Sequence, residues 1–339
     1  MRILIIKTSS MGDIIHTLPA LTDAIAAIPN IRFDWVVEDA FSIIPSWHPA
    51  VDRIIPVSLR RWRKGIFTKD TRAEWKEVRR HLSERTYDAV IDAQGLLKSA
   101  FLSRYTYGVR MGLDFQSARE RLASLFYQRR LKVPLHQHAI HRMRSLFSQA
   151  LQYSLPESPA NYGIHLLRQM EPQEEPYVVF LHATTWETKL WPEAFWMELI
   201  GEVAKIGWKV KVSGGNPLEV ARAKRFERSH EAVQALPYLS IQEMAELLQQ
   251  AKGVISVDTG FGHLAAALNV PTLSLYGSTD PALTGAIGPH SYHLKAHFAC
   301  APCLKRTCIF QKNEPTFPPC YESLSPKLVW ERFKQILNL

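Results

Sequence analysis

At 339 residues the chain is too long for one compact core, and its length suits two domains of roughly 160 residues each. Hydrophobic residues make up 46% and charged residues 22%, which is ordinary for a globular protein and argues against disorder. The net charge of +9 implies an anionic partner: a nucleic acid, an acidic membrane surface or a phosphorylated substrate.

The sequence contains no stretch that predicts a membrane span, because Asp258 and His263 interrupt the longest apolar run. The opening residues MRILIIK are too few for the apolar core of a signal peptide. We therefore expect a cytoplasmic protein that touches a membrane only at its surface.

Through the first half of the chain, short apolar runs alternate with helical stretches. The sequence predicts strands over residues 2–6, 33–37 and 89–92, and helices over about 13–28 and 137–151. This alternation predicts a doubly wound parallel sheet. The polar, Pro-containing stretch 171–176 then indicates a linker.

A second alternation begins at Tyr177. It predicts strands over 178–183, 209–214 and 254–257, and helices over about 192–206, 217–226, 241–250 and 323–339. Two Rossmann-like halves in one chain usually bind ligands in the cleft between them, at the carboxyl ends of the strands. We therefore expect an α/β fold with a first domain over 1–165, a second over 176–322, and a last helix over 323–339.

The segment VISVDTGFGHLAAALNVPTLSLYG, residues 254–277, is the most informative part of the chain. It predicts a strand, a tight turn at 258–260, a helix opening at His263, and a second strand. Unpaired backbone N–H groups and the positive end of the helix dipole then face one point, which favours phosphate. Thr259 adds a hydroxyl to this point. The structural alternative is an ordinary strand–turn–helix with Asp258 as the N-cap.

The motif KTSSMGD, residues 7–13, follows the first predicted strand. Asp13 begins the helix and shares a helix face with His16, three residues on. A carboxylate at the edge of a cleft is what a general base needs to take a proton from a sugar hydroxyl. The structural alternative is an N-cap with a glycine turn. The motif is not a P-loop, because GxxxxGK[ST] is absent.

The motif HATTxxxKxW, residues 182–191, follows another predicted strand. Its two threonines and Lys189 suit a diphosphate, although a solvated loop lysine is the simpler interpretation. Together with the turn at 258–260, this loop is able to hold one nucleotide diphosphate from both sides. Glu219, shortly after the strand that ends at Gly214, is placed to accept hydrogen bonds from ribose hydroxyls.

Basic residues gather at RRWRK, residues 60–64, and again over 119–132. An exposed basic loop is the commoner fate of such a run. Trp47 and Trp62 interleave with the basic residues, which leaves nucleic-acid binding open, but no helix-turn-helix, RNP or KH signature supports it.

All four cysteines, Cys300, Cys303, Cys308 and Cys320, lie in a Pro-rich segment near the C-terminus. The C-x2-C pair is typical of a metal site, whereas the other spacings fit no standard zinc signature. We expect reduced thiols, with structural zinc as the alternative.

Taken together, KTSSMGD, RRWRK, DAQGLLKSA, HATT…KxW and SVDTGFGHL…YGSTDP resemble the ADP-heptose:lipopolysaccharide heptosyltransferases of glycosyltransferase family 9. The resemblance covers about residues 1–290. It implies a GT-B fold with the acceptor held by the first domain and the nucleotide sugar by the second. It also implies a C-terminal helix that crosses back onto the first domain, and inverting, metal-independent transfer with no cofactor.

The resemblance also implies roles for single residues. Asp13 resembles the catalytic base. The groups that resemble those holding the donor ADP-heptose are Thr184, Thr185, Lys189, Glu219, Asp258, Thr259, Gly260 and His263. The positions that resemble acceptor-binding ones are Ser10, Arg60, Arg61, Arg63, Lys64, Arg119 and His138. An acceptor such as Kdo2–lipid A, densely anionic and seated in an acidic leaflet, gives the basic clusters a reason. It implies a peripheral protein on the cytoplasmic face of the inner membrane, with no nucleic-acid partner.

Two alternatives remain open at this point. The CAPCxxxxC segment after Pro289 looks more like the tail of family members that add a later heptose, although KTSSMGD and RRWRK favour the first-heptose step. From another class, the chain fits a nucleotide-sugar or nucleic-acid binding module without turnover. Asp13 separates these readings, because a binding module does not need a carboxylate at the edge of the cleft.

Overall fold

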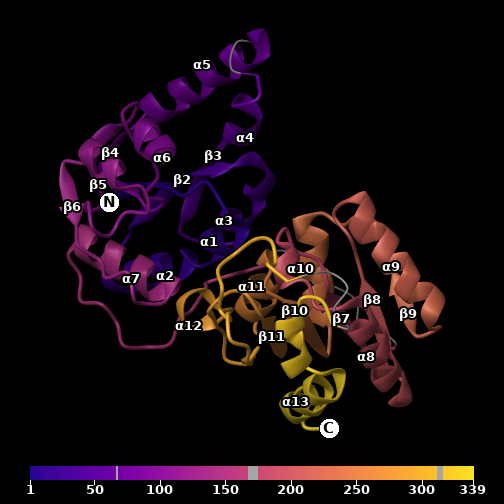
Figure 1. Ribbon diagram of the computed structural model, residues 1–339. Helices are drawn as coiled ribbons and strands as arrows, with labels where there is room; N and C mark the ends of the chain where they lie inside the picture. The colour runs from indigo at the N-terminus through magenta and orange to yellow at the C-terminus, as the bar shows by residue number, and fades with distance from the viewer. Residues whose placement is uncertain (66–67, 167–174, 311–315) are drawn as a thin grey trace. The chain divides into compact units, whose positions relative to one another are not determined.

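The computed structural model describes residues 1–65, 68–166, 175–310 and 316–339, and Figure 1 shows their helices and strands. The chain divides into two compact units, Met1–Leu167 and Arg168–Leu339. Residues 171–174 of the expected linker lie outside the described residues. Each unit is built on one six-stranded sheet, so we describe the units separately.

The first unit has a parallel sheet in the order β3-β2-β1-β4-β5-β6. Its strands are β1 (Arg2–Ile6), β2 (Arg32–Glu38), β3 (Val51–Val57), β4 (Thr86–Asp92), β5 (Tyr107–Leu113) and β6 (Arg129–Leu131). The central strand β1 is buried along nearly its whole length, because helices cover both faces of a parallel sheet. This explains why its sequence, RILII, is a continuous apolar run.

The second unit repeats this plan in the order β12-β11-β10-β7-β8-β9, again with all pairs parallel. Its strands are β7 (Tyr177–Leu181), β8 (Lys209–Val212), β9 (Val233–Ala235), β10 (Gly253–Val257), β11 (Thr272–Tyr276) and β12 (Ser291–Lys295). Numbered within each unit, both sheets have the Rossmann order 3-2-1-4-5-6. The predicted doubly wound α/β fold with two Rossmann-like halves is confirmed.

The helices of the first unit alternate with its strands. They are α1 (Met11–Ile15), α2 (Leu18–Ala27), α3 (Ile43–Ser46), α4 (Leu59–Trp62), α5 (Lys69–Ser83), α6 (Leu97–Ser103) and α7 (Ala139–Leu151), with short 3-10 helices η1 (Asp39–Phe41) and η2 (Arg121–Phe126). The single helix expected over 13–28 is two helices. Pro19 lies in the first turn of α2, where its missing N–H is harmless, whereas a continuous helix would require that N–H.

The second unit carries α8 (Glu193–Lys205), α9 (Pro217–Ser229), α10 (Ile241–Gln250), α11 (Gly260–Ala267), α12 (Pro281–Thr284) and α13 (Pro326–Leu337), with η3 (Glu187–Lys189) and η4 (Pro319–Ser323). The sequence predicts that this helix opens at His263, whereas α11 begins three residues earlier, at Gly260. Within the described residues, every helix is too short or too polar to cross a bilayer.

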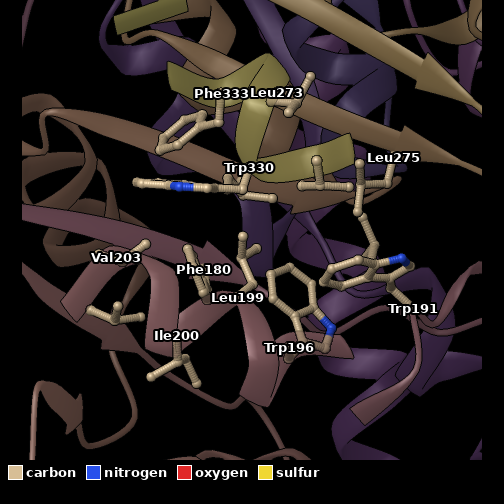
Figure 2. Packing of buried hydrophobic residues seen from close by; sticks show 14 of the residues in the cluster. Phe180, Trp191, Trp196, Leu199, Ile200, Val203, Leu273, Leu275, Trp330 and Phe333 are labelled. Atoms are coloured by element: carbon tan, nitrogen blue, oxygen red, sulfur yellow. The ribbon is translucent and has the colours of Figure 1, made fainter. Parts of the chain in front are cut away.

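The C-terminal helix α13 belongs to the core of the second unit. Figure 2 shows Trp330 and Phe333 of α13 packed with Phe180 of β7, Leu199 of α8 and Leu273 of β11. The Phe333 ring also lies so close to Gly253 that a side chain there would collide with it. We expected this helix to cross back to the first domain. In the structure the apolar side of α13 is buried against the sheet of the second unit, and the crossing to the first domain stays a prediction.

Candidate active site

The residues that the sequence singled out gather in two places, one in each unit, at the carboxyl ends of the central strands. In the second unit, Thr184 follows β7, Asp258 follows β10 and Glu219 lies beyond the end of β8. Strand β7 pairs with both β8 and β10, so these three strand ends are neighbours. The β7–β10 pair is the point where the strand order reverses, and open α/β sheets bind ligands at such points.

Asp258 is the centre of this second-unit group. Its Oδ2 atom lies 2.7 Å from Lys189 Nζ and accepts a hydrogen bond of 2.6 Å from Thr279 Oγ1. His263 Nε2 lies 3.7 Å from Oδ1 of the same carboxylate. Burial raises the pKa of Asp258, but His263 and Lys189 outweigh it and hold that pKa well below its ordinary value. The carboxylate is therefore ionised at neutral pH.

The DTG turn presents the amino end of α11. Thr259 precedes the helix in an extended conformation, and its side chain makes no capping hydrogen bond. The Thr184 hydroxyl donates to the Asp258 carbonyl, 3.1 Å away, and thereby ties the loop after β7 to this turn. The positive end of α11 and the Lys189 ammonium thus both lie next to Asp258, an arrangement that favours an anion.

Glu219 lies in the first turn of α9, just beyond the end of β8. Its Oε2 atom accepts a hydrogen bond of 2.8 Å from the Gly215 N–H. Asn216 caps the same helix through the N–H groups of Leu218 and Glu219. A Cβ on Gly214 would lie 2.4 Å from the Val220 nitrogen, so only glycine permits this close approach of strand end and helix. The fold therefore fixes Glu219 at the same edge of the sheet as Asp258.

Sequence reasoning missed two side chains around Lys189. Lys189 Nζ lies 4.5 Å from the centre of the Trp186 ring, and the Arg306 guanidinium carbon lies 5.3 Å from the same ring. The Thr188 hydroxyl donates to the Lys305 carbonyl, which fastens the segment around Arg306 to η3. Trp186 lies within the HATTxxxKxW motif, so the motif could have indicated its place beside Lys189. Nothing in the sequence placed Arg306 there. Thr185 is exposed in the loop after β7.

In the first unit, Asp13 lies in α1, directly after the loop that follows β1. Its Oδ2 atom accepts two hydrogen bonds of 2.8 Å from Ser10, one from the N–H and one from the hydroxyl. Burial raises the pKa of Asp13. The charge of Lys7, the Ser10 hydrogen bonds and the charge of Arg119 together outweigh burial, so the pKa is lowered on balance. Asp13 therefore belongs to the capping box of α1 and is also an ionised carboxylate.

The loop before Asp13 is held by the residues that follow β4. Gln94 Oε1 accepts from the N–H groups of Thr8 at 3.0 Å and Ser9 at 3.1 Å. Lys7 is buried and donates from Nζ to the Ala93 carbonyl, and burial lowers the pKa of Lys7. Strands β1 and β4 form the switch point of this sheet. The DAQG motif was the sequence signal for this positioning role, which the sequence analysis did not assign.

His138 joins the same neighbourhood. Its ring lies edge-on to His16 with centroids 5.5 Å apart, and its Nδ1 atom accepts from the Ile140 N–H to cap α7. His16 is the C-cap residue of α1, and α2 begins two residues later, at Leu18. His138 therefore packs against the buried His16, which lies three residues after Asp13 in the chain.

The RRWRK residues lie in and after α4, and their surroundings differ. Arg61 makes two hydrogen bonds to Glu74, at 2.9 and 2.7 Å, so its charge is already paired. The Arg60 backbone N–H donates to Glu38, and its guanidinium lies over Phe41. Burial lowers the pKa of the Lys98 amine, and the nearby charges of Arg60 and Arg63 also lower it. Arg63 and Lys64 are exposed.

The four cysteines are free thiols, of which Cys320 is buried. Burial, together with the neighbouring Cys300, Cys308 and Cys303, raises the pKa of the Cys320 thiol to about 12. Across residues 1–65, 68–166, 175–310 and 316–339, no group of three or more His, Cys, Asp or Glu side chains is arranged to hold a metal ion. Reduced thiols therefore stay the prediction for these cysteines, with structural zinc as the alternative.

Comparisons with known proteins all find heptosyltransferases. The family model for glycosyltransferase family 9 (heptosyltransferase) matches residues 75–314. The chain is similar to lipopolysaccharide heptosyltransferase 1 of Pseudomonas aeruginosa (strain PAO1), 51% identical over 349 residues, which covers 99% of this chain and 98% of that protein. Its structure is similar to that of the E. coli heptosyltransferase WaaC with ADP-2-deoxy-2-fluoro heptose, with a TM-score of 0.85, 46% identity and 99% of each chain covered. Lipopolysaccharide heptosyltransferase 2 of E. coli (strain K12) is 22% identical over 303 residues, covering 84% of this chain and 85% of that protein.

Proposed function

The chain belongs to glycosyltransferase family 9, the heptosyltransferases, and we propose that it moves L-glycero-D-manno-heptose from ADP-heptose to Kdo2–lipid A with inversion at the transferred carbon. The observation that carries the proposal is the Asp13 carboxylate. Ser10 holds it at the end of β1, and the charges of Lys7 and Arg119 keep it ionised. A base placed in this way has a use in a transferase and none in a module that only binds.

The chemistry assigns a task to each group. A hydroxyl oxygen of the acceptor attacks the anomeric carbon of the heptose, and the bond from that carbon to the phosphate oxygen breaks, leaving ADP with the bonding electrons. Asp13 takes the hydroxyl proton. Its lowered pKa makes it a weak base, so proton transfer must come late, after the attacking oxygen has gained positive charge.

The donor contacts are part of the same proposal. Lys189 and the amino end of α11 face the diphosphate and stabilise the negative charge that grows on it as ADP leaves. Thr184, Thr185, Thr259, Gly260 and His263 complete the phosphate contacts. Glu219 accepts from the ribose hydroxyls and Asp258 contacts the heptose. The relative WaaC was solved with an ADP-heptose analogue, which supports this donor.

The acceptor is proposed from the basic groups of the first unit. Ser10, Arg60, Arg61, Arg63, Lys64, Arg119 and His138 suit the carboxylates and phosphates of Kdo2–lipid A. Because Glu74 already pairs Arg61, we expect Arg61 to contribute less than Arg63 or Lys64. A lipid acceptor also supports attachment to the cytoplasmic face of the inner membrane.

The second candidate function is transfer to an acceptor that already carries one heptose. The cysteine segment favours it, whereas the identities of 51% to a heptosyltransferase 1 and 22% to a heptosyltransferase 2 favour the first-heptose step. Offering ADP-heptose with each purified acceptor and measuring the mass gained separates the two. Gain of one heptose on bare Kdo2–lipid A is the expected result, and gain only on the pre-heptosylated acceptor would move the enzyme one step later.

The base assignment is tested by Asp13→Asn, which keeps the size of the side chain but removes its basicity. We expect the turnover rate to fall about 10²- to 10⁴-fold while ADP binding stays within a factor of two. Asp52→Asn is the matched control, because Asp52 lies near the amino end of β3, at the opposite edge of the same sheet. Turnover of Asp13→Asn at the wild-type rate would remove Asp13 from the mechanism.

A further inference from the structure

One surface of the first unit exposes several large apolar side chains together. Leu122 and Leu125 are 55% and 62% exposed, and Phe115 is 48% exposed. The two leucines lie three residues apart in the 3-10 helix η2, where residues i and i+3 project from the same side. Exposed apolar residues that occur singly need no explanation, but a group of them marks an interaction site.

Contacts between neighbouring elements bring these side chains onto one surface. The Arg121 guanidinium lies over the Phe115 ring, 5.7 Å from its centre. Helix α6 packs beside η2 over the buried Ala100, Ala123 and Tyr127.

The start of α6 is tied to the same place, because the Leu97 N–H donates to Glu120 Oε2 at 2.6 Å. Leu97 and Phe101, both exposed, are four residues apart on α6 and share a helix face. We call Leu97, Phe101, Phe115, Leu122 and Leu125 the η2 surface. Its elements lie beside β4, β5 and β6 in the magenta part of the first unit (Figure 1).

The charges around the η2 surface are mostly positive. Arg130 Nε donates to the Ser124 carbonyl and Arg110 Nε to the Phe126 carbonyl, which fixes two guanidinium groups against η2. Arg121 and Arg129 are exposed next to them. Of the acidic side chains here, Glu120 accepts from the Leu97 N–H, and Asp114 accepts from the backbone N–H groups of Gln116 and Ser117. The four arginines outnumber these two carboxylates, so the rim of the surface is positive on balance.

We propose that the η2 surface docks on an anionic lipid leaflet, with its apolar side chains in the headgroup region and its arginines on the lipid phosphates. Apolar tips surrounded by arginines are the composition that lies at a membrane interface, because each arginine reaches an anionic headgroup while its stem covers apolar area. Arg119, the proposed acceptor contact, directly precedes Glu120. This adjacency rests on the proposed function. It places the docking surface beside the end of the unit where a lipid acceptor must enter.

The test uses the full chain and vesicles that contain no acceptor. We expect wild-type protein to co-sediment with phosphatidylglycerol-containing vesicles and much less with pure phosphatidylcholine. The double variant Leu122→Ser/Leu125→Ser should bind the anionic vesicles at least about tenfold more weakly. Arg121→Gln/Arg129→Gln should bind them about tenfold or more weakly at low salt, with the difference shrinking at high salt.

Controls separate docking from folding and from catalysis. Leu218 and Arg228 lie on α9 of the second unit, and Leu218 is 80% exposed, so Leu218→Ser/Arg228→Gln is a matched surface change. It should bind vesicles as wild type does. The thermal midpoint of the Leu122→Ser/Leu125→Ser variant should stay unchanged, because both side chains point outward.

Two outcomes would overturn the proposal. One is that Leu122→Ser/Leu125→Ser binds anionic vesicles as tightly as wild type. The other is that this variant changes self-association in sedimentation velocity while vesicle binding stays intact, which would make the surface an interface between copies of the chain. Neither outcome bears on heptose transfer, since failure of the proposed function would appear as no mass gain on either acceptor.

Discussion

At the scale of single residues, the candidate site is a set of charges that compensate one another. Asp258 is held by Lys189 and Thr279, and Asp13 by Ser10 with Lys7 and Arg119 nearby. A buried carboxylate without such partners would be costly, so each partner is required for the other to stay charged. Asp258 therefore keeps the Lys189 ammonium in place at the position where we propose that it meets a diphosphate.

Lys189→Met tests this arrangement. The change leaves the negative charge of Asp258 uncompensated where the diphosphate is expected, so ADP should bind about 10- to 100-fold more weakly. Isothermal titration with ADP measures the effect, and adenosine, which has no phosphate, should bind as before.

Lys252→Met is the matched control, because Lys252 is exposed and immediately precedes β10, at the opposite end of the strand from Asp258. It should leave ADP affinity unchanged, and Lys189→Arg should restore part of the loss. Equal ADP affinity in Lys189→Met and wild type would exclude Lys189 from the diphosphate site.

At the scale of the elements, both groups of residues depend on how strands end and helices begin. Gly214 admits the close approach of α9 that sets Glu219, and the break before Pro19 leaves α1 a short helix with Asp13 in its first turn. Helix α13 packs Trp330 and Phe333 into the core of the second unit (Figure 2). The sheet that carries Asp258 is therefore supported by the last helix of the chain.

Trp330→Ala should destabilise the second unit by about 3–5 kcal/mol, because it removes a large buried side chain from the core. Denaturant unfolding followed by circular dichroism gives the free energy of unfolding. Leu328→Ala on the same helix is the control, since Leu328 is exposed and should cost far less. If the two variants were equally stable, α13 would not be part of this core.

At the scale of the whole molecule, two units of the same topology each carry a buried histidine that stays neutral. Burial and the neighbouring His165 lower the pKa of His48 to about 4 in the first unit. Burial and the charge of Arg222 lower the pKa of His182 to about 4 in the second. Among the described residues the ring nitrogens of His182 have no hydrogen-bond partner, whereas those of His48 contact Thr22 and the Ala50 N–H.

Stability should fall as the pH is lowered from about 6.5 toward 4. In that window the unfolded chain binds protons at His48 and His182 and the folded chain does not, so acid favours unfolding. Each histidine should cost about 2 kcal/mol of unfolding free energy between pH 7 and pH 5. Unfolding measured at both pH values, for wild type and two variants, tests this.

His182→Leu should flatten the pH dependence of the second unit's transition, and His48→Asn that of the first. A pH dependence left unchanged by both variants would show that other groups govern acid unfolding.

The sequence alone determined the fold class, the residues at the strand ends and the family resemblance. Buried parallel strands require continuous apolar runs, and the loops between them carry KTSSMGD, HATT and DTG, all of which are local signals. The sequence therefore singled out Asp13, Lys189, Glu219 and Asp258 as candidates, because each lies in a loop or first helical turn that follows such a strand.

Only the tertiary structure decided which distant residues meet. Four contacts join segments that are separated in the chain. Arg61 pairs with Glu74, and Gln94 holds the loop before Asp13. Arg306 approaches Trp186, and α13 is buried in the second unit. The joint η2 surface has the same origin, since α6 and η2 come together only by packing. Such contacts depend on sheet order and side-chain packing, which no local pattern of residues encodes.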